Sequence, residues 1–359
     1  CGLRSPVGER NSMRYLIAAS VLGLTGSTTA DIWTVDDDGP ADFDNIQAAV
    51  DAASNGDEIV VEPGTYTSEE NSYVVDMDGK SITLRSSGTA ETTIIDAQGT
   101  GWGVDCRDGV SPDGVIDGFT ITGSADWGIN CEFSSPTIRG CTITDNQGGV
   151  YFSESAEGEP TITDCLIVGN TATSLGGGIC CSYSTSPTIS NCTITGNSAG
   201  NTKITMGGGI YCGGGCSPTI SNCLIEENEA VIGGGIACWY EGDVISISGC
   251  SIVNNTATCG VIWQAAPELC GGGIYSFQHN VAMTSSSVCG NSPNQIDISS
   301  SLNVLIDNGD NVIRFGHADL EYVLETWGTL WSSPGDVNYD GSVNIVDLLM
   351  VLSNWGPCP

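Results

Sequence analysis

Basic residues are scarce in this chain of 359 residues. Nine lysines and arginines stand against 43 aspartates and glutamates, a net charge of −34. So few positive charges cannot form the basic patch that nucleic acid requires, which excludes DNA and RNA as partners. An anionic polysaccharide would also be repelled unless metal ions bridged it to the surface. Histidine is nearly absent too, with only His279 and His317.

No apolar run is long enough to span a bilayer. The run at 15–26 has about 12 residues, against the 20 or so that a transmembrane helix needs. It follows Met13 and Arg14 and precedes Thr28-Thr29-Ala30, which predicts a secretory signal peptide cleaved before Asp31. We assign 1–30 to an N-terminal extension plus this signal peptide, and expect 1–12 to come from an overlong gene model. The mature protein is then secreted, extracellular or at the cell surface, without a transmembrane segment.

The central part of the chain has no helical period, and a short phrase recurs along it. Its form is Ser-Pro-Thr-Ile-x-x-Cys-x-Ile-x-x-Asn, followed after a gap by Gly-Gly-Gly-Ile-x-Cys. Copies lie at 135–146, 159–170, 186–197, 217–228 and 244–255. A repeat of this length is one supersecondary unit stacked on its neighbours. The alternation of apolar and small polar residues, rich in Thr, Ile and Val, predicts short β-strands.

Stacked units place equivalent residues in columns along one axis. The first column contains Phe119, Cys141, Cys165, Cys192, Cys223 and Cys250. The second contains Cys106, Cys131, Phe152, Cys181, Cys212, Cys238 and Ser276. The third contains Asn146, Asn170, Asn197, Asn228, Asn255 and Asn291. Because Cys alternates with Phe, we expect both cysteine columns to be interior and most of their thiols to be free. The stacked asparagines are expected to hydrogen-bond along the axis.

These columns, together with the segment at 34–66 that ends in Pro-Gly-Thr-Tyr, resemble the right-handed parallel β-helix, or pectin-lyase-like, superfamily. The resemblance implies an all-β solenoid over 31–315 with a short N-terminal capping helix at about 44–53. It does not select a function, because the fold hosts lyases, hydrolases, esterases, epimerases and adhesins. Among the cysteines outside the columns, Cys259 and Cys270 bracket an insertion and are the best candidates for a disulfide.

A calcium-binding loop is predicted near the C-terminal end. The ligand set of this EF-hand-like loop is Asp336, Asn338, Asp340, the Ser342 carbonyl, Asn344 and Asp347, with Gly341 at the sharp turn. Asp rather than Glu at the last position resembles the dockerin loop. We therefore assign 316–359 to a small α-helical dockerin-like module that binds Ca²⁺ and serves anchoring or sorting. A cohesin-like or cell-envelope partner is implied, although 308–318 lacks the spacing of the second loop that dockerins carry.

Three residues are candidates for catalysis of the pectate-lyase type. Aligning the repeats places Asp96, Asp117 and Arg139 at one position on successive turns. Carboxylates on adjacent turns would hold Ca²⁺ against a uronate, and the arginine would act as base. The alternative is a set of solvated turn residues with one ion pair. Neither histidine has the Gly-His-Gly context of polygalacturonases, and the motifs of pectin methylesterases and C5-epimerases are missing.

Two tryptophans are candidates for glycan contact. Trp102 and Trp127 align across neighbouring turns, two residues before an inward-facing position. They would stack as one aromatic step for sugar rings, or else pack over the edge of the helix. The sequence thus predicts a secreted β-helix protein whose repetitive surface serves adhesion or binds a polysaccharide or cell-surface glycan. The alternatives are a structural envelope protein and a polysaccharide-degrading enzyme, either a pectate-lyase-like lyase or a glycoside hydrolase, with the same calcium module.

Overall fold

The computed structural model describes most of the chain between residues 30 and 314. The described residues are 30–68, 72–155, 158–200, 204–240, 242, 244–258, 271–277, 279–292, 296–298, 305–307 and 312–314. The predicted signal peptide, the Cys259–Cys270 pair and the calcium loop lie outside these residues. Within them, no helix combines the length and the apolar character needed to cross a membrane.

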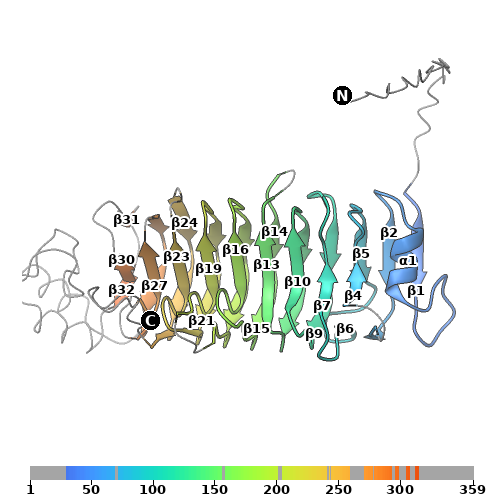
Figure 1. Ribbon diagram of the computed structural model, residues 1–359, viewed down its shortest axis with the longest axis horizontal. Coiled ribbons are helices and arrows are strands. Elements are labelled where there is room, and N and C mark those ends of the chain that lie inside the picture. The colour runs from blue at the N-terminus through green and yellow to red at the C-terminus, as the bar shows by residue number, and fades with distance from the viewer. Residues whose placement is uncertain are drawn as a thin grey trace, which may run out of the picture. The chain divides into compact units, whose positions relative to one another are not determined.

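Short parallel strands form three long sheets, and each full turn of the chain adds one strand to each of them (Figure 1). Sheet A contains β1 (Ile32–Val35), β2 (Glu58–Val61), β5 (Thr83–Ser86), β8 (Val115–Asp117), β11 (Thr137–Arg139), β14 (Thr161–Thr163), β17 (Thr188–Ser190), β20 (Thr219–Ser221), β24 (Val244–Ser248), β28 (Asn280–Thr284) and β31 (Leu305–Asp307). Sheet B contains β3 (Gly64–Tyr66), β6 (Thr93–Asp96), β9 (Thr120–Thr122), β12 (Thr142–Thr144), β15 (Leu166–Val168), β18 (Thr193–Thr195), β21 (Leu224–Glu226), β25 (Ser251–Val253), β29 (Ser287–Cys289) and β32 (Val312–Arg314).

Sheet C contains the strands that carry the candidate site. They are β4 (Tyr73–Asp76), β7 (Trp102–Asp105), β10 (Trp127–Glu132), β13 (Gly148–Ser153), β16 (Ile179–Ser182), β19 (Ile210–Gly213), β23 (Ile236–Trp239), β27 (Ile274–Phe277) and β30 (Ile296–Ile298). A further pair, β22 (Glu229–Ala230) and β26 (Thr256–Ala257), forms a separate two-stranded sheet. Among the described strands all pairings are parallel, so the predicted parallel β-helix is confirmed.

The alternation of the strand residues explains why the coils close around an apolar interior. In β11, β14 and β17 the central isoleucines Ile138, Ile162 and Ile189 are fully buried and pair in register, while the flanking residues face outward. Both predicted cysteine columns are buried, and the second is in register from Cys131 through Phe152 to Cys181. Reversing the alternation by one residue would expose this whole set, so the hydrophobic pattern fixes the register.

The predicted asparagine column forms a continuous buried hydrogen-bond chain. Asn170 Nδ2 donates to Asn197 Oδ1 at 3.0 Å, and Asn197 Nδ2 donates to Asn228 Oδ1 at 3.0 Å. Each Oδ1 also accepts from the backbone N–H one coil earlier, as Asn197 does from Asn170 at 3.0 Å. Each Nδ2 further donates to a strand carbonyl, such as that of Ile167 at 2.9 Å from Asn197. One amide therefore satisfies several buried polar groups at the turn between sheets B and C.

The cysteines of the columns carry free thiols, as expected. All described cysteines except Cys289, which is disulfide-bonded, are free and buried. Thiols of the first column donate to the carbonyl two residues earlier, for example from Cys192 Sγ to Ser190 at 3.1 Å. Parallel Cα–Cβ directions one rung apart do not meet disulfide geometry. Outside the columns, burial raises the pKa of the Cys180 thiol to about 12, which keeps it protonated and unreactive.

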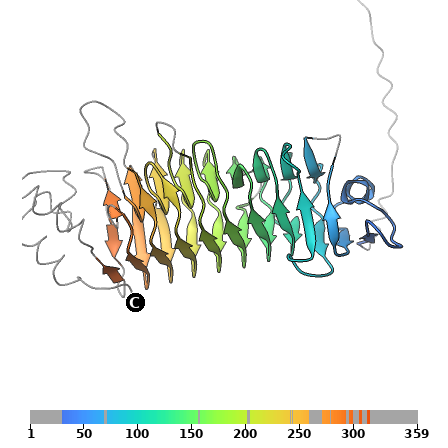
Figure 2. The same ribbon diagram turned by 90° about the horizontal axis from the view of Figure 1, so that it is seen from below.

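A short helix covers the N-terminal end of the coils. Helix α1 (Ile46–Ala52) begins at the N-cap Asn45, whose side chain accepts a hydrogen bond from the Ala48 backbone N–H at 2.8 Å. It buries Ile46, Ala49 and Val50 against the first strands. Figure 2 shows α1 at the blue end, beyond the first strands of the stack. The predicted capping helix is therefore confirmed.

The glycine triplets permit close approach between coils. A Cβ on Gly208 would lie 2.5 Å from the carbonyl oxygens of both Glu229 and Gly234, which belong to the next coil. A Cβ on Gly209 would lie 3.1 Å from Asn228 Nδ2 in the asparagine column. The glycines are needed here because backbone and amide groups of the neighbouring coil occupy the space that a side chain would take.

Candidate functional site

Aromatic residues are distributed very unevenly over the three sheets. Among the described residues, Trp33, Phe43 and Tyr66 lie in the N-terminal cap region, and Phe119 and Phe152 fill the interior. All remaining aromatic residues of the described chain belong to sheet C strands or directly follow one. They are Tyr73, Trp102, Trp127, Phe133, Tyr151, Tyr183, Tyr211, Trp239, Tyr240, Tyr275 and Phe277. The outer faces of the repeat strands in sheets A and B carry mostly Thr and Ser instead.

The outer face of sheet C is built from rows of residues in register. The central outward row is Asp76, Asp105, Asn130, Tyr151, Cys180, Tyr211, Ala237, Tyr275 and Asp297. Polar side chains thus occupy the row at its N-terminal end, and mainly aromatic and small apolar ones follow. Because the inward positions on either side of this row are filled by the apolar columns, the row can face only outward.

The aromatic part of this face forms a hydrophobic cluster separate from the interior. Cys180, Tyr211 and Tyr275 are buried in it, and Trp127, Tyr151, Trp239 and Phe277 are partly exposed. Trp127 stacks on Tyr151 with ring centroids 5.3 Å apart, and Trp239 stacks on Phe277 at 4.8 Å. Met206, Val231 and Ile232 are buried in the same cluster, so only the partly exposed rings present a surface to solvent, and they are held in fixed orientations that suit stacking on a flat apolar surface.

The polar end of the same face holds an arginine between a carboxylate and an indole. Asp105 is fully buried, accepts from Arg107 Nη2 at 2.7 Å and accepts from Asn130 Nδ2 at 3.2 Å. The Arg107 guanidinium lies 4.8 Å from the centre of the Trp102 ring, a cation–π contact. The hydrogen bond to Asp105 raises the pKa of Arg107. Burial, with the nearby Asp105 charge adding to it, raises the pKa of Asp76.

A shallow depression opens beside this face where the strands leave sheet C. Its volume is about 440 Å³, and it is lined by Glu154, Ser155, Tyr183, Ser184 and Gly214. Ser155 Oγ lies 2.6 Å from Thr185 Oγ1, and Ser184 Oγ donates to the Gly214 carbonyl at 3.3 Å. The depression therefore combines an exposed aromatic ring with a carboxylate and hydroxyl groups on neighbouring coils.

The three predicted catalytic residues do not lie at one position, so that alignment was wrong. Asp96 belongs to β6 in sheet B and pairs with Thr122. Asp117 and Arg139 belong to sheet A, where they are register partners, and Arg139 Nε donates to Asp117 Oδ2 at 2.9 Å. The motifs look alike because strands of sheets A and B share the pattern Thr-Ile-polar. A half-exposed ion pair remains at Asp117 and Arg139.

The predicted alignment of Trp102 and Trp127 holds, but their stacking does not. The pairing of Ile129 with Val104 places the two tryptophans at equivalent positions of β7 and β10. Their described ring contacts are with other groups, since Trp127 stacks on Tyr151 and Trp102 faces the Arg107 guanidinium. Both rings are partly buried and belong to the outer face of sheet C.

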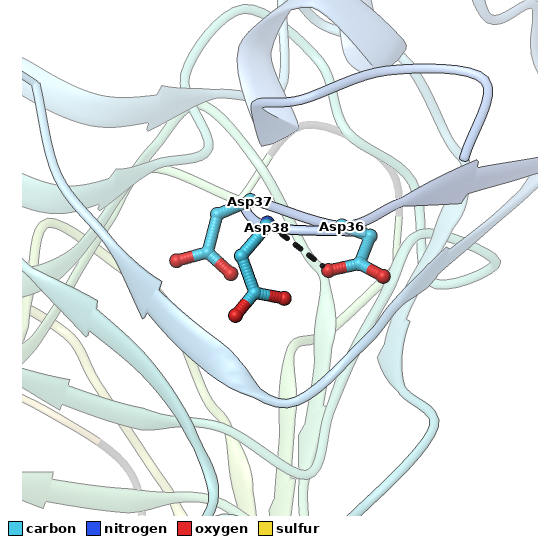
Figure 3. A group of neighbouring side chains, drawn as sticks. All are labelled: Asp36, Asp37 and Asp38. Carbon is cyan, nitrogen blue, oxygen red and sulfur yellow. Dashed lines mark hydrogen bonds between the residues drawn. The ribbon is translucent and has the colours of Figure 1, made fainter. Parts of the chain in front are cut away.

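A separate carboxylate group lies between β1 and α1 (Figure 3). One carboxylate oxygen from each of Asp36, Asp37 and Asp38 can be chosen so that all lie within 4.8 Å of one another. The backbone N–H of Asp38 donates to Asp36 Oδ1 at 3.2 Å. Near them burial, reinforced by the charges of Asp37 and Asp36, raises the pKa of Tyr66 to about 12. Asp37 and Asp38 are exposed and Asp36 is partly buried, and the described contacts of the group are those of a turn.

Sequence reasoning missed most of the aromatic face. Tyr151, Tyr211 and Tyr275 each stand one residue before the second cysteine column, so the column itself marks them as outward. Trp239 and Phe277 stand one residue after it. Reading the residues on both sides of a predicted interior column would have found this surface.

Comparisons with known proteins agree with this architecture. The family described as "Right handed beta helix region" matches residues 45–185, 115–269 and 169–311. Among solved structures, the pectin methylesterase from carrot is similar, with 15% identity and a TM-score of 0.52 over 81% of this chain and 90% of that chain. At this identity the likeness concerns the fold alone.

Two further structures are more distant. The pectin methylesterase from Aspergillus niger has 14% identity and a TM-score of 0.35, over 79% of this chain and 87% of that chain. The pectate lyase Pel9A has 12% identity and a TM-score of 0.36, over 89% and 90%. The search of curated protein sequences finds no match.

Proposed function

Because the chain belongs to the right-handed β-helix family, we propose that it is a polysaccharide-binding protein whose ligand lies along the outer face of sheet C. The observation that carries this proposal is the segregation of aromatic residues to that one face. Stacked, partly exposed rings suit the flat apolar faces of sugars, and a row of them suits a polymer. The fold is shared with a carrot pectin methylesterase, a protein named for action on a polysaccharide. We place the protein outside the cell, as the predicted signal peptide implies.

The outer face of sheet C is tested by removing its first aromatic pair. We expect Trp127→Ala combined with Tyr151→Ala to weaken polysaccharide binding about thirtyfold, because two stacking contacts are lost and each is worth about 1 kcal/mol. Affinity electrophoresis of the full chain in gels containing single polysaccharides measures this. The matched control is Thr188→Ala with Thr219→Ala, which alters the outer face of sheet A by the same number of residues.

Two results would contradict the proposal. If none of a panel of neutral and acidic polysaccharides retards the parent protein, glycan binding strong enough to be detected by affinity electrophoresis is excluded. Equal retardation of the parent and of the Trp127 and Tyr151 double variant would exclude the outer face of sheet C as the binding surface.

We also propose that the C-terminal segment binds one Ca²⁺ and anchors the protein to a cohesin-like or cell-envelope partner. The support is the spacing of oxygen ligands from Asp336 to Asp347. Calorimetry on the full chain is expected to show one Ca²⁺ site that is lost in Asp336→Ala with Asp340→Ala, because two of its charged ligands are removed. Undiminished binding in that variant would mean that the ion is held elsewhere. The control variant, Asp36→Asn with Asp38→Asn, tests the other group of neighbouring carboxylates as the alternative site.

An enzyme of the pectate-lyase type remains the second candidate. The ion pair of Asp117 and Arg139 is its remaining support. Arginine is protonated in water, and this one is paired with a carboxylate, so it is poorly suited to act as a base. Unsaturated products from a uronate polymer with Ca²⁺, lost in Arg139→Ala, would favour this candidate over simple binding.

A further inference from the structure

Large aromatic residues occupy left-handed backbone positions where strands leave sheet C. Phe133, Tyr183 and Tyr240 directly follow β10, β16 and β23, with φ of 55°, 55° and 75°. In this region the side chain crowds the backbone, so glycine, asparagine and aspartate are preferred and bulky residues are rare. The register makes these residues part of one column, which we call the sheet C exit column. Its described members are Gly79, Asp108, Phe133, Glu154, Tyr183, Gly214 and Tyr240, all with positive φ.

The other two sheets supply an internal comparison. From β8 and β9 onward, the described residues that directly follow their strands adopt the same left-handed conformation but are small or polar. After sheet A they are Gly118, Gly140, Asp164, Asn191, Asn222, Gly249 and Ser285. After sheet B they are Gly123, Asp145, Gly169, Gly196, Glu227, Asn254 and Gly290. Small or polar residues thus occupy the left-handed positions after sheets A and B, as is usual. After sheet C, aromatic residues occupy three such positions, at a cost in backbone strain. Strain of this kind is characteristic of functional positions.

These three rings do not contribute to the core. Their exposed fractions are 46% for Phe133, 62% for Tyr183 and 60% for Tyr240. Among the described residues, they are the only aromatic ones in the set of exposed large hydrophobic side chains. Since exposed rings gain little from burial, packing does not account for the strain.

The spacing of the rings is regular along the coil axis. β13 lies between β10 and β16, and β19 lies between β16 and β23. Successive rings are therefore two rungs apart, about 9.6 Å at the strand spacing of a sheet. Glu154 and Gly214 occupy the rungs between them and line the depression beside Tyr183. Between Phe133 and Tyr240 the column thus alternates an aromatic residue with a non-aromatic one, first Glu154 and then Gly214.

We propose that Phe133, Tyr183 and Tyr240 are stacking platforms for one extended polysaccharide chain that runs parallel to the coil axis. This rests on the proposed function and names its ligand class, a neutral β-1,4-linked hexose polymer. Each ring of such a polymer is turned by half a turn relative to the previous one, so equal faces recur at every second sugar, as the platforms recur at every second rung. A neutral chain fits because Asp108 and Glu154 stand in the same column and the protein is strongly acidic, which repels polyanions.

The strain itself provides the test. Asparagine tolerates the left-handed conformation, so Tyr183→Asn with Tyr240→Asn removes two platforms and relieves strain at once. The melting temperature of the full chain is expected to stay unchanged or rise. Affinity for a β-1,4-linked hexasaccharide of glucose or mannose is expected to fall at least tenfold by calorimetry. In the parent, affinity should rise steeply from disaccharide to hexasaccharide because the longer ligand reaches several platforms. The double variant should lose most of that rise.

The controls separate this inference from the proposed function. Asn191→Gly with Asn222→Gly changes two left-handed residues after sheet A and should leave binding unchanged. If the Tyr183 and Tyr240 double variant binds like the parent while the Trp127 and Tyr151 double variant does not, the proposed stacking role of the exit column is wrong. The proposed binding face on sheet C then still stands. A marked drop in melting temperature would assign the rings a packing role and overturn their stacking role too. Equally tight binding of polygalacturonate would overturn the neutral ligand class, and a parent that binds no polysaccharide overturns both proposals.

Discussion

Replacing Asn197 by alanine is expected to lower the free energy of unfolding by about 3–5 kcal/mol. The substitution leaves the backbone N–H and the Nδ2 of Asn170 without their acceptor and the Ile167 carbonyl without its side-chain donor. These groups are buried, and each unsatisfied one costs about 1–3 kcal/mol. Denaturant unfolding of the full chain, followed by circular dichroism, measures the difference.

The matched control for Asn197 lies on the same coil. Asn191 is exposed and left-handed, so Asn191→Gly removes an asparagine without touching the buried hydrogen-bond chain. We expect that variant to stay within about 0.5 kcal/mol of the parent. Similar stabilities of the Asn197 and Asn191 variants would mean that the asparagine column does not support the coils.

Replacing Gly208 by alanine is expected to cost about 4 kcal/mol or more, or to prevent folding. The new Cβ would lie 2.5 Å from two carbonyl oxygens of the next coil and 2.6 Å from the Glu229 nitrogen. Backbone atoms hydrogen-bonded between coils cannot move aside, so the clash must separate the coils locally. The yield of soluble protein and the denaturant midpoint report the effect.

Substitution of Gly99 is the control that separates the cost of steric overlap from the cost of an unfavourable backbone conformation. The φ of this glycine is +78°, and nothing lies within 4 Å of a Cβ built on it. Gly99→Ala should therefore cost only about 1–2 kcal/mol, the conformational term of a left-handed residue. If the Gly208 variant were no less stable than this one, close coil approach would not be the reason for the glycine.

The interior of this protein could be predicted from its sequence, because every coil repeats the same physical requirement. Cys192 and Cys223 were expected inside because phenylalanine replaces cysteine elsewhere in their columns, and they are buried. Asn197 was expected to bond to its neighbours along the axis, and it does. Stacking turns each local pattern into a column, so several copies of the repeat give evidence about every position.

The surface was harder to predict because a coil has three outer faces with similar short strands. Asp96 was assigned to the same position as Asp117, although Thr-Ile-polar patterns occur in both sheets A and B. The left-handed conformation of Tyr183 has no signature in the amino-acid sequence, since glycine usually marks such a position. The outward position of Tyr151, by contrast, follows from the neighbouring column. The calcium ligands from Asp336 to Asp347 stay a prediction.

The alternation within the sheet C exit column limits how the gene of such a protein can lengthen. Tandem duplication of a single coil would place two aromatic residues of this column on adjacent rungs, or two non-aromatic ones, and the rows beyond the insertion would fall out of phase with those before it. Duplication of two coils at a time would preserve the phase. We therefore expect longer versions of this solenoid to differ by even numbers of coils between Phe133 and Tyr240, although the hydrophobic interior would accept any number.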